Sequence, residues 1–122
     1  ITTPSPVLSV RIANAMATHP EMVSGQGRND LALTRAGRGD WVCKVGADGV
    51  QTIASRSRGV GIAAKVGDGN LKALMVAVIA VLEQLGWLDE EGRQDLKDWL
   101  PAPLKNAAGH EVGHMMAVLR LA

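Results

Sequence analysis

The sequence lacks several residue classes, and each absence excludes a kind of protein. It has neither phenylalanine nor tyrosine, so its core must be built from aliphatic side chains and three tryptophans. Its single cysteine excludes an intrachain disulfide and a multi-cysteine zinc site. The longest apolar run, residues 73–82, is well short of the roughly 20 residues that a membrane span requires. These absences leave an ordinary globular composition.

Neither sign of charge is in excess. Thirteen basic and twelve acidic residues give a net charge of +1, without the basic excess typical of nucleic-acid binding. No charged-then-apolar signal segment opens the chain. We therefore expect a protein of the cytoplasm with neither nucleic-acid nor membrane partners. With 122 residues the chain is a single domain, or the C-terminal part of a longer protein, because its first residues read like a linker.

The hydrophobic pattern predicts an α+β fold, an antiparallel sheet with packed helices. Alternating apolar positions predict strands over residues 41–45, 50–54 and 60–66, with Asp48-Gly49 as the first turn. A stripe with helical spacing, Leu71, Leu74, Met75, Val78, Ile79, Leu82 and Leu85, predicts a buried helix over residues 71–85.

The remaining segments carry weaker signals. Ser5-Pro6 is typical of a helix start and Pro20 of its end, and a short helix is expected near residues 31–35. Asp89 caps another short helix. Residues 101–109 read as a loop, and residues 111–119 as a strand or a helix.

His110-Glu111-Val112-Gly113-His114 matches the H-E-x-x-H pattern of zinc proteases. That chemistry needs a helix, so that both imidazoles face one metal, and a third ligand downstream. Residues 115–122 contain no His, Asp, Glu or Cys, and Gly113 disfavours a helix. We therefore expect a coincidental match on a strand or a terminal segment, and no metal site.

The segment around Lys44 is the better candidate site. Alternation puts Lys44 on the opposite face of its strand from Cys43, which reads as a buried cysteine rather than a nucleophile. The glycine-rich turn after Lys44 lets backbone amides approach a ligand closely. A second glycine-rich loop, residues 25–27, presents Arg28 but lacks the context of a dinucleotide fingerprint.

Three ordered segments together resemble the asparaginase II family, the Rhizobium-type L-asparaginases. They are residues 22–28 (MVSGQGR), 44–50 (KVGADGV) and 59–70 (GVGIAAKVGDGN), and residues 106–113 (NAAGHEVG) resemble the last segment of that family. The resemblance covers the C-terminal part of the family. It implies a fold similar to the serine β-lactamases and glutaminases.

The resemblance also implies a chemistry. In that family a serine of an S-x-x-K motif attacks the side-chain amide of asparagine, lysines activate the serine, and ammonia leaves. The strand lysine maps onto Lys44, with Val45 where the wider fold usually has a hydroxyl residue. The oxyanion and substrate positions map onto Gly46, the N–H of Ala47, and Arg28.

The chain contains no Ser-x-x-Lys, since none of its five serines is followed by lysine three residues later. The resemblance places the nucleophile, and the cysteine and lysine that bind zinc in some members, in an N-terminal part outside this chain. It further implies a homodimer, or a companion N-terminal part. Two alternatives remain open: a non-catalytic fragment or binding module of the same fold, and, less favoured, a zinc metalloprotease.

Overall fold

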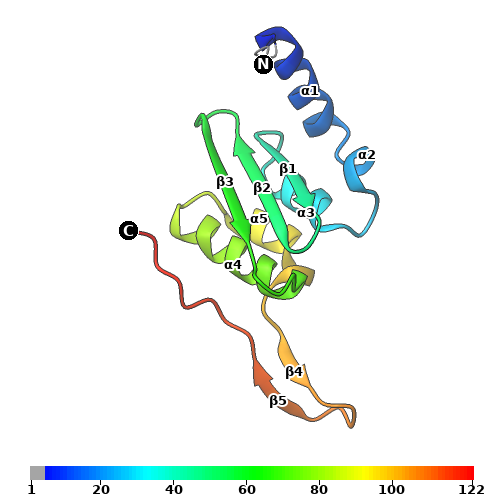
Figure 1. Cartoon of the computed structure of the whole chain (residues 1–122), viewed down its shortest axis with the longest axis vertical. Helices are drawn as coiled ribbons and strands as arrows, with labels where there is room; N and C mark the ends of the chain where they lie inside the picture. The colour runs from blue at the N-terminus through cyan, green and yellow to red at the C-terminus, as the bar shows by residue number, and fades with distance from the viewer. Residues whose placement is uncertain (1–4) are drawn as a thin grey trace.

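The computed structural model describes residues 5–122 and has an α+β architecture. Figure 1 shows a three-stranded sheet with helices on one side, a helix rising from it near the N-terminus, and a separate hairpin near the C-terminus. The elements are α1 (Pro6–Thr18), α2 (Glu21–Ser24), α3 (Asn29–Ala36), β1 (Trp41–Gly46), β2 (Val50–Ser55), β3 (Val60–Lys65), α4 (Leu71–Gln84), α5 (Glu90–Asp95), the 3₁₀ helix η1 (Lys97–Trp99), β4 (Pro103–Lys105) and β5 (Glu111–His114).

The main sheet is an antiparallel meander in the order β1-β2-β3. Each predicted strand is confirmed to within one residue. The β1–β2 hairpin closes through Ala47, Asp48 and Gly49, and the last two have positive φ angles of 62° and 74°. Asparagine, aspartate and glycine adopt this left-handed region most readily, which is why Asp-Gly marks the turn in the sequence. Within residues 5–122, β1 pairs with β2 alone, so its other edge is free.

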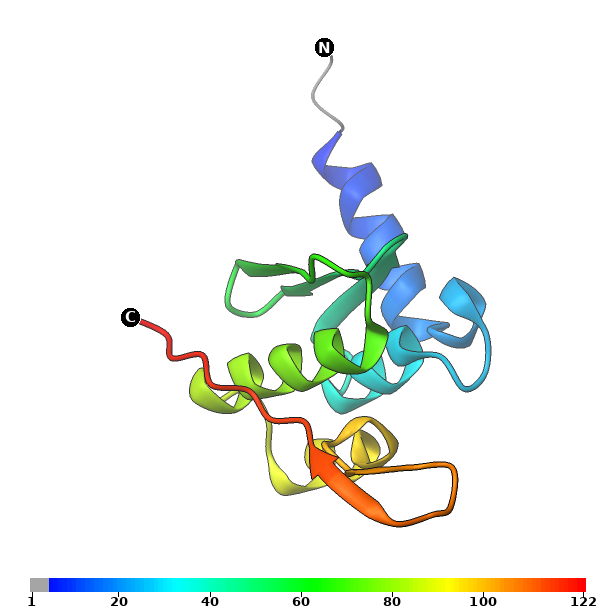
Figure 2. The same ribbon diagram turned by 60° about the horizontal axis from the view of Figure 1, so that its bottom comes forward.

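Helix α4 lies beneath the sheet and forms the centre of the core (Figure 2). Five members of its predicted stripe are buried: Leu74, Met75, Val78, Ile79 and Leu82. Leu71 is only partly buried and Leu85 is exposed, because they lie at the two ends of the helix. Within residues 5–122, no helix is both long and apolar enough to cross a membrane.

Trp41 supplies the bulk that phenylalanine and tyrosine provide in most cores. It is 1% exposed, and its ring lies 6.2 Å from that of Trp87, centroid to centroid. Gly37 makes this packing possible, because a Cβ at this position would overlap the Trp41 side chain. The core therefore depends on a glycine next to a tryptophan as much as on the aliphatic stripe of α4.

The C-terminal region departs from the prediction. Residues 101–109 were expected to be a loop, but residues 103–105 form β4, which pairs with β5 in a second, two-stranded sheet. Asn106 closes the turn: its side-chain oxygen accepts hydrogen bonds from the N–H groups of Ala108 and His110. The strand was not predicted because it begins with proline. Proline donates no ladder hydrogen bond and is tolerated mainly at sheet edges and strand starts.

Helix α1 confirms the helix that Ser5-Pro6 and Pro20 predict. It begins at Pro6, and the Ser5 side chain makes no capping hydrogen bond. None of its residues is buried, and Val7, Leu8, Val10 and Ile12 are each at least half exposed. The apolar positions of α1 are therefore largely exposed, unlike those of α4.

Replacing Ile79 with aspartate should unfold the domain. The side chain is 2% exposed, so the change removes roughly 1.5–3 kcal/mol of hydrophobic burial and places a charge in an apolar site. Thermal unfolding followed by circular dichroism measures the effect. Lys72→Asp, at an exposed position of the same helix, is the control and should melt close to the wild type. A wild-type melting temperature for Ile79→Asp would contradict this packing.

Candidate active site

Lys44 lies at the free edge of β1. The Thr52 hydroxyl of β2 donates to the Lys44 carbonyl at 3.0 Å, so the next carbonyl, of Val45, points away from β2. The ammonium of Lys44 donates to that Val45 oxygen at 2.8 Å. The lysine therefore curls around the strand edge. Its side chain is 54% exposed, so the ammonium is accessible from solvent.

A shallow, mainly apolar groove borders Lys44. Helix α1, helix α2 and the segment between them supply its other lining residues, which are Ala15, Met16, His19, Met22 and Val23. Such a groove can shelter the apolar part of a ligand or of another chain segment while Lys44 supplies a charge.

A buried polar cluster lies next to the lysine. The Asp30 carboxylate, in the first turn of α3, has no exposed side-chain surface, and its Oδ2 lies 3.8 Å from the Lys44 ammonium. The Ser24 hydroxyl donates to the same Oδ2 at 2.5 Å, and Gln51 donates through Nε2 to Oδ1 at 3.0 Å. Asn29 donates through Nδ2 to Gln51 Oε1 at 2.6 Å. A carboxylate at the start of α3 also interacts favourably with the helix dipole.

The turn after Lys44 is compatible with the expected role in binding an oxyanion. Gly46 is tightly placed, since a Cβ there would lie 3.0 Å from the Val50 Cβ. Within residues 5–122 the N–H of Ala47 donates to no backbone or side-chain acceptor, and Ala47 is exposed. A free amide of this kind is what an oxyanion-binding position requires.

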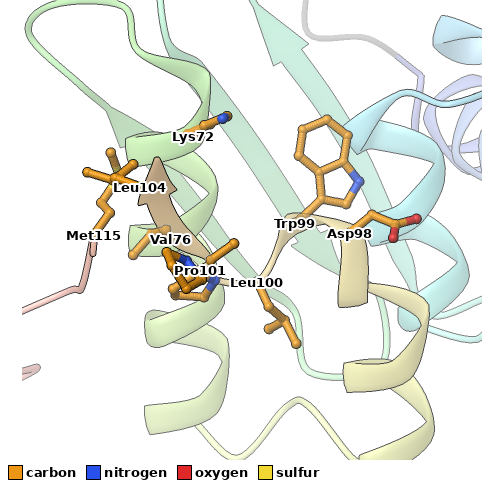
Figure 3. Close-up of a pocket in the computed structure, with 10 residues that line it drawn as sticks. Lys72, Val76, Asp98, Trp99, Leu100, Pro101, Leu104 and Met115 are labelled. Carbon is orange, nitrogen blue, oxygen red and sulfur yellow. The ribbon is translucent and has the colours of Figure 1, made fainter. Parts of the chain in front are cut away.

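Arg28 lines a different hollow from Lys44. Its neighbours there include Arg35 of α3, Asp98 and Trp99. A further hollow lies at the base of the β4–β5 hairpin, where the Trp99 ring faces α4 (Figure 3). None of the predicted site residues lines the hollow at the base of the β4–β5 hairpin. The structure thus brings Lys44, Gly46 and Ala47 together, whereas Arg28 opens onto a separate surface.

Cys43 is on the inner face of the sheet, as its alternation with Lys44 predicts. It is 1% exposed, and burial raises the pKa of its thiol to about 12. A thiol with so high a pKa is almost entirely protonated near neutral pH and is a poor nucleophile. Cys43 is therefore a core residue.

The H-E-x-x-H match lies on an extended segment. Glu111–His114 forms β5, and His110 precedes it in the hairpin turn. Along a strand, positions four residues apart are separated by roughly 13 Å, too far for two imidazoles to share one zinc ion. The part of the chain that the structure describes contains no group of three or more His, Cys, Asp or Glu side chains arranged around a common point.

Sequence reasoning missed the polar cluster around Asp30. Asn29-Asp30 reads as ordinary helix-start chemistry, and Gln51 as a polar residue within a strand. Only the tertiary packing of α3 against the sheet brings Gln51 to the start of α3. The available signal was that Gln51 alternates with buried Ile53 and therefore faces inward.

The fold and this edge site define a small α+β protein with a lysine-centred candidate active site. Residues 4–117 match the family model described as L-asparaginase II. Since the match covers nearly the whole chain, the protein belongs to the L-asparaginase II family. The resemblance seen in the glycine-rich segments is thereby confirmed. A search of curated proteins found no match.

Cys43 should resist alkylation in the native protein. At pH 8, iodoacetamide should modify it at least tenfold more slowly than after unfolding in guanidinium chloride, because burial both shields the thiol and raises its pKa to about 12. Mass spectrometry of the alkylated chain follows the reaction. Equal rates for folded and unfolded protein would place Cys43 at the surface.

Zinc should have no effect on the H-E-x-x-H segment. Added zinc should neither raise the melting temperature nor produce a chelator-sensitive protease activity. The chain from His110 to His114 is extended along β5, which keeps the two imidazoles apart. Stoichiometric, tight zinc binding that is lost in His114→Ala would contradict this.

Proposed function

We propose that this chain is part of an amidohydrolase that converts L-asparagine to aspartate and ammonia. Family membership supports the reaction class. The observation that carries the assignment to this region is the position of Lys44, with an accessible ammonium at a free strand edge, beside a groove and a turn with a free amide.

The proposed mechanism uses a serine and lysines. A serine hydroxyl attacks the side-chain amide carbon, and its proton passes to the lysine pair and on to the leaving nitrogen. The C–N bond breaks, ammonia leaves, and water hydrolyses the resulting ester to aspartate and free serine. Lys44 is the strand lysine of this pair. The amide of Ala47, next to Gly46, stabilises the oxyanion. Arg28 is left out of this mechanism, because it lines a different hollow from Lys44.

The nucleophile is proposed to lie outside these residues, because none of the serines in the chain begins an S-x-x-K motif. The chain is then the C-terminal part of the enzyme, with a fold similar to the serine β-lactamases. The exposed apolar side chains of α1, which include Val7, Val10 and Ile12, are available to contact the remaining part or a second subunit. We further propose that the enzyme is a homodimer and that it acts in the cytoplasm.

The missing S-x-x-K also favours a second candidate, a non-catalytic binding module that retains the fold. The two candidates differ in the encoded product. A full-length protein with S-x-x-K upstream of these residues supports the enzyme, and a product without that motif supports the binding module.

In the full-length protein, Lys44→Met should reduce kcat for asparagine by ~10²–10⁴, the usual contribution of a proton-transfer group, with the fold retained. Ammonia release measures the rate, and circular dichroism checks the fold. Methionine keeps the length of the side chain and removes its charge.

Cys43→Ser, one residue away on the inner face, is the matched control. It should lower the melting temperature because a hydroxyl costs more to bury than a thiol, and it should leave turnover near wild type because the side chain is 1% exposed and does not reach the groove. Asparagine hydrolysis at the wild-type rate in Lys44→Met would remove Lys44 from the site. Absence of hydrolysis in the wild-type full-length protein would overturn the function itself.

A further inference from the structure

Asp30 is a buried carboxylate held by side chains from three parts of the chain. Ser24 at the end of α2 and Gln51 of β2 donate hydrogen bonds to its two oxygens, and Asn29 of α3 holds Gln51 in turn. These bonds fix both carboxylate oxygens in place. A charge without exposed surface requires this degree of compensation.

Lys44 is the one cation within 4.0 Å of this carboxylate among residues 5–122. The two partners differ in exposure: the Asp30 side chain is 0% exposed and the Lys44 side chain 54%. A pair with one solvated member contributes little to stability. Its consequence is geometric, because a rigid buried anion next to a flexible surface lysine restricts where the ammonium lies.

We propose that Asp30 is a positioning residue for Lys44, whose buried carboxylate holds the ammonium at the free edge of β1 beside the groove. The inference rests on the proposed function for its kinetic consequences and on the structure for the pairing itself. Asp30 does not touch the groove; it acts through Lys44.

The groups that face Lys44 come from several elements. His19 lines the same groove, and its Nδ1 lies 3.8 Å from Glu21 Oε1. From β2, the neighbouring side chain is the uncharged Thr52. Among residues 5–122, Asp30 is the acidic group that pairs with Lys44, so its removal should change the position of the ammonium.

The test compares Asp30→Asn with Asp40→Asn in the full-length protein. Asparagine keeps the shape of the side chain and removes its charge. Asp40 is the matched control, since it also accepts a serine hydrogen bond and pairs with an arginine, but at the other end of β1. For Asp30→Asn we expect a fall in kcat of roughly 10–100-fold, the effect of a misplaced reacting group, with KM nearly unchanged. Asp40→Asn should keep both constants.

The rate per folded molecule distinguishes positioning from simple loss of stability. We divide kcat by the folded fraction, measured by circular dichroism in the assay buffer. A misplaced ammonium lowers the rate of the folded enzyme in Asp30→Asn, whereas a merely structural role leaves that rate at the wild-type value.

Ser24→Ala covers the case in which Asp30→Asn does not fold. It keeps the carboxylate charge and removes one of the bonds that orient it, so kcat per folded molecule should fall, by less than in Asp30→Asn. Wild-type kcat per folded molecule in Asp30→Asn, in an enzyme that Lys44→Met inactivates, would overturn the inference and leave the proposed function intact.

A measurement without turnover tests the pairing even if the proposed function fails. Trace acetylation followed by peptide mass spectrometry reports the reactivity of Lys44 relative to the exposed Lys72. Since an amine held against the Asp30 carboxylate meets the reagent less freely, the Lys44 ratio should rise several-fold in Asp30→Asn and stay constant in Asp40→Asn. Equal ratios in the wild type and Asp30→Asn would show that the carboxylate does not act on Lys44.

Discussion

The packing of α4 against the inner face of the sheet is the interaction on which the rest of the structure depends. A chain without phenylalanine or tyrosine must fill its core with branched and linear aliphatic side chains, and α4 supplies most of them. Trp41 completes the layer because Gly37 leaves room for its ring. With this layer in place, β1 becomes an edge strand whose free side carries the candidate site.

The candidate site joins a well-packed region to an incompletely covered one. Asp30, Gln51 and Cys43 are buried on the inner side of the sheet, whereas Lys44 curls around the strand edge toward solvent. The groove beside it is lined by α1 and α2, and α1 itself has no buried residue. This edge therefore places a buried carboxylate, held by α3 and β2, beside a surface that can accept a ligand or another chain segment.

Patterns along the chain predicted those parts of the fold that depend on neighbours in sequence. The meander followed from alternation and from Asp48-Gly49, and α4 from its stripe, because both periodicities are local properties of the backbone. The β4–β5 hairpin was missed because β4 has only three residues and begins with proline. Pairing with β5 creates that strand, and pairing is not a local property.

Residue types at fixed spacing are enough to assign the family, the faces of β1 and the inertness expected of Cys43. They also show that the zinc-like pattern lacks a helical context. The proximity of Asp30 to Lys44, and the separate hollow that Arg28 lines, became visible only in the folded chain. Both follow from the way α3 and β1 meet, through strand register and core packing. These set distances between residues far apart in the chain, and no spacing along the sequence encodes such distances directly.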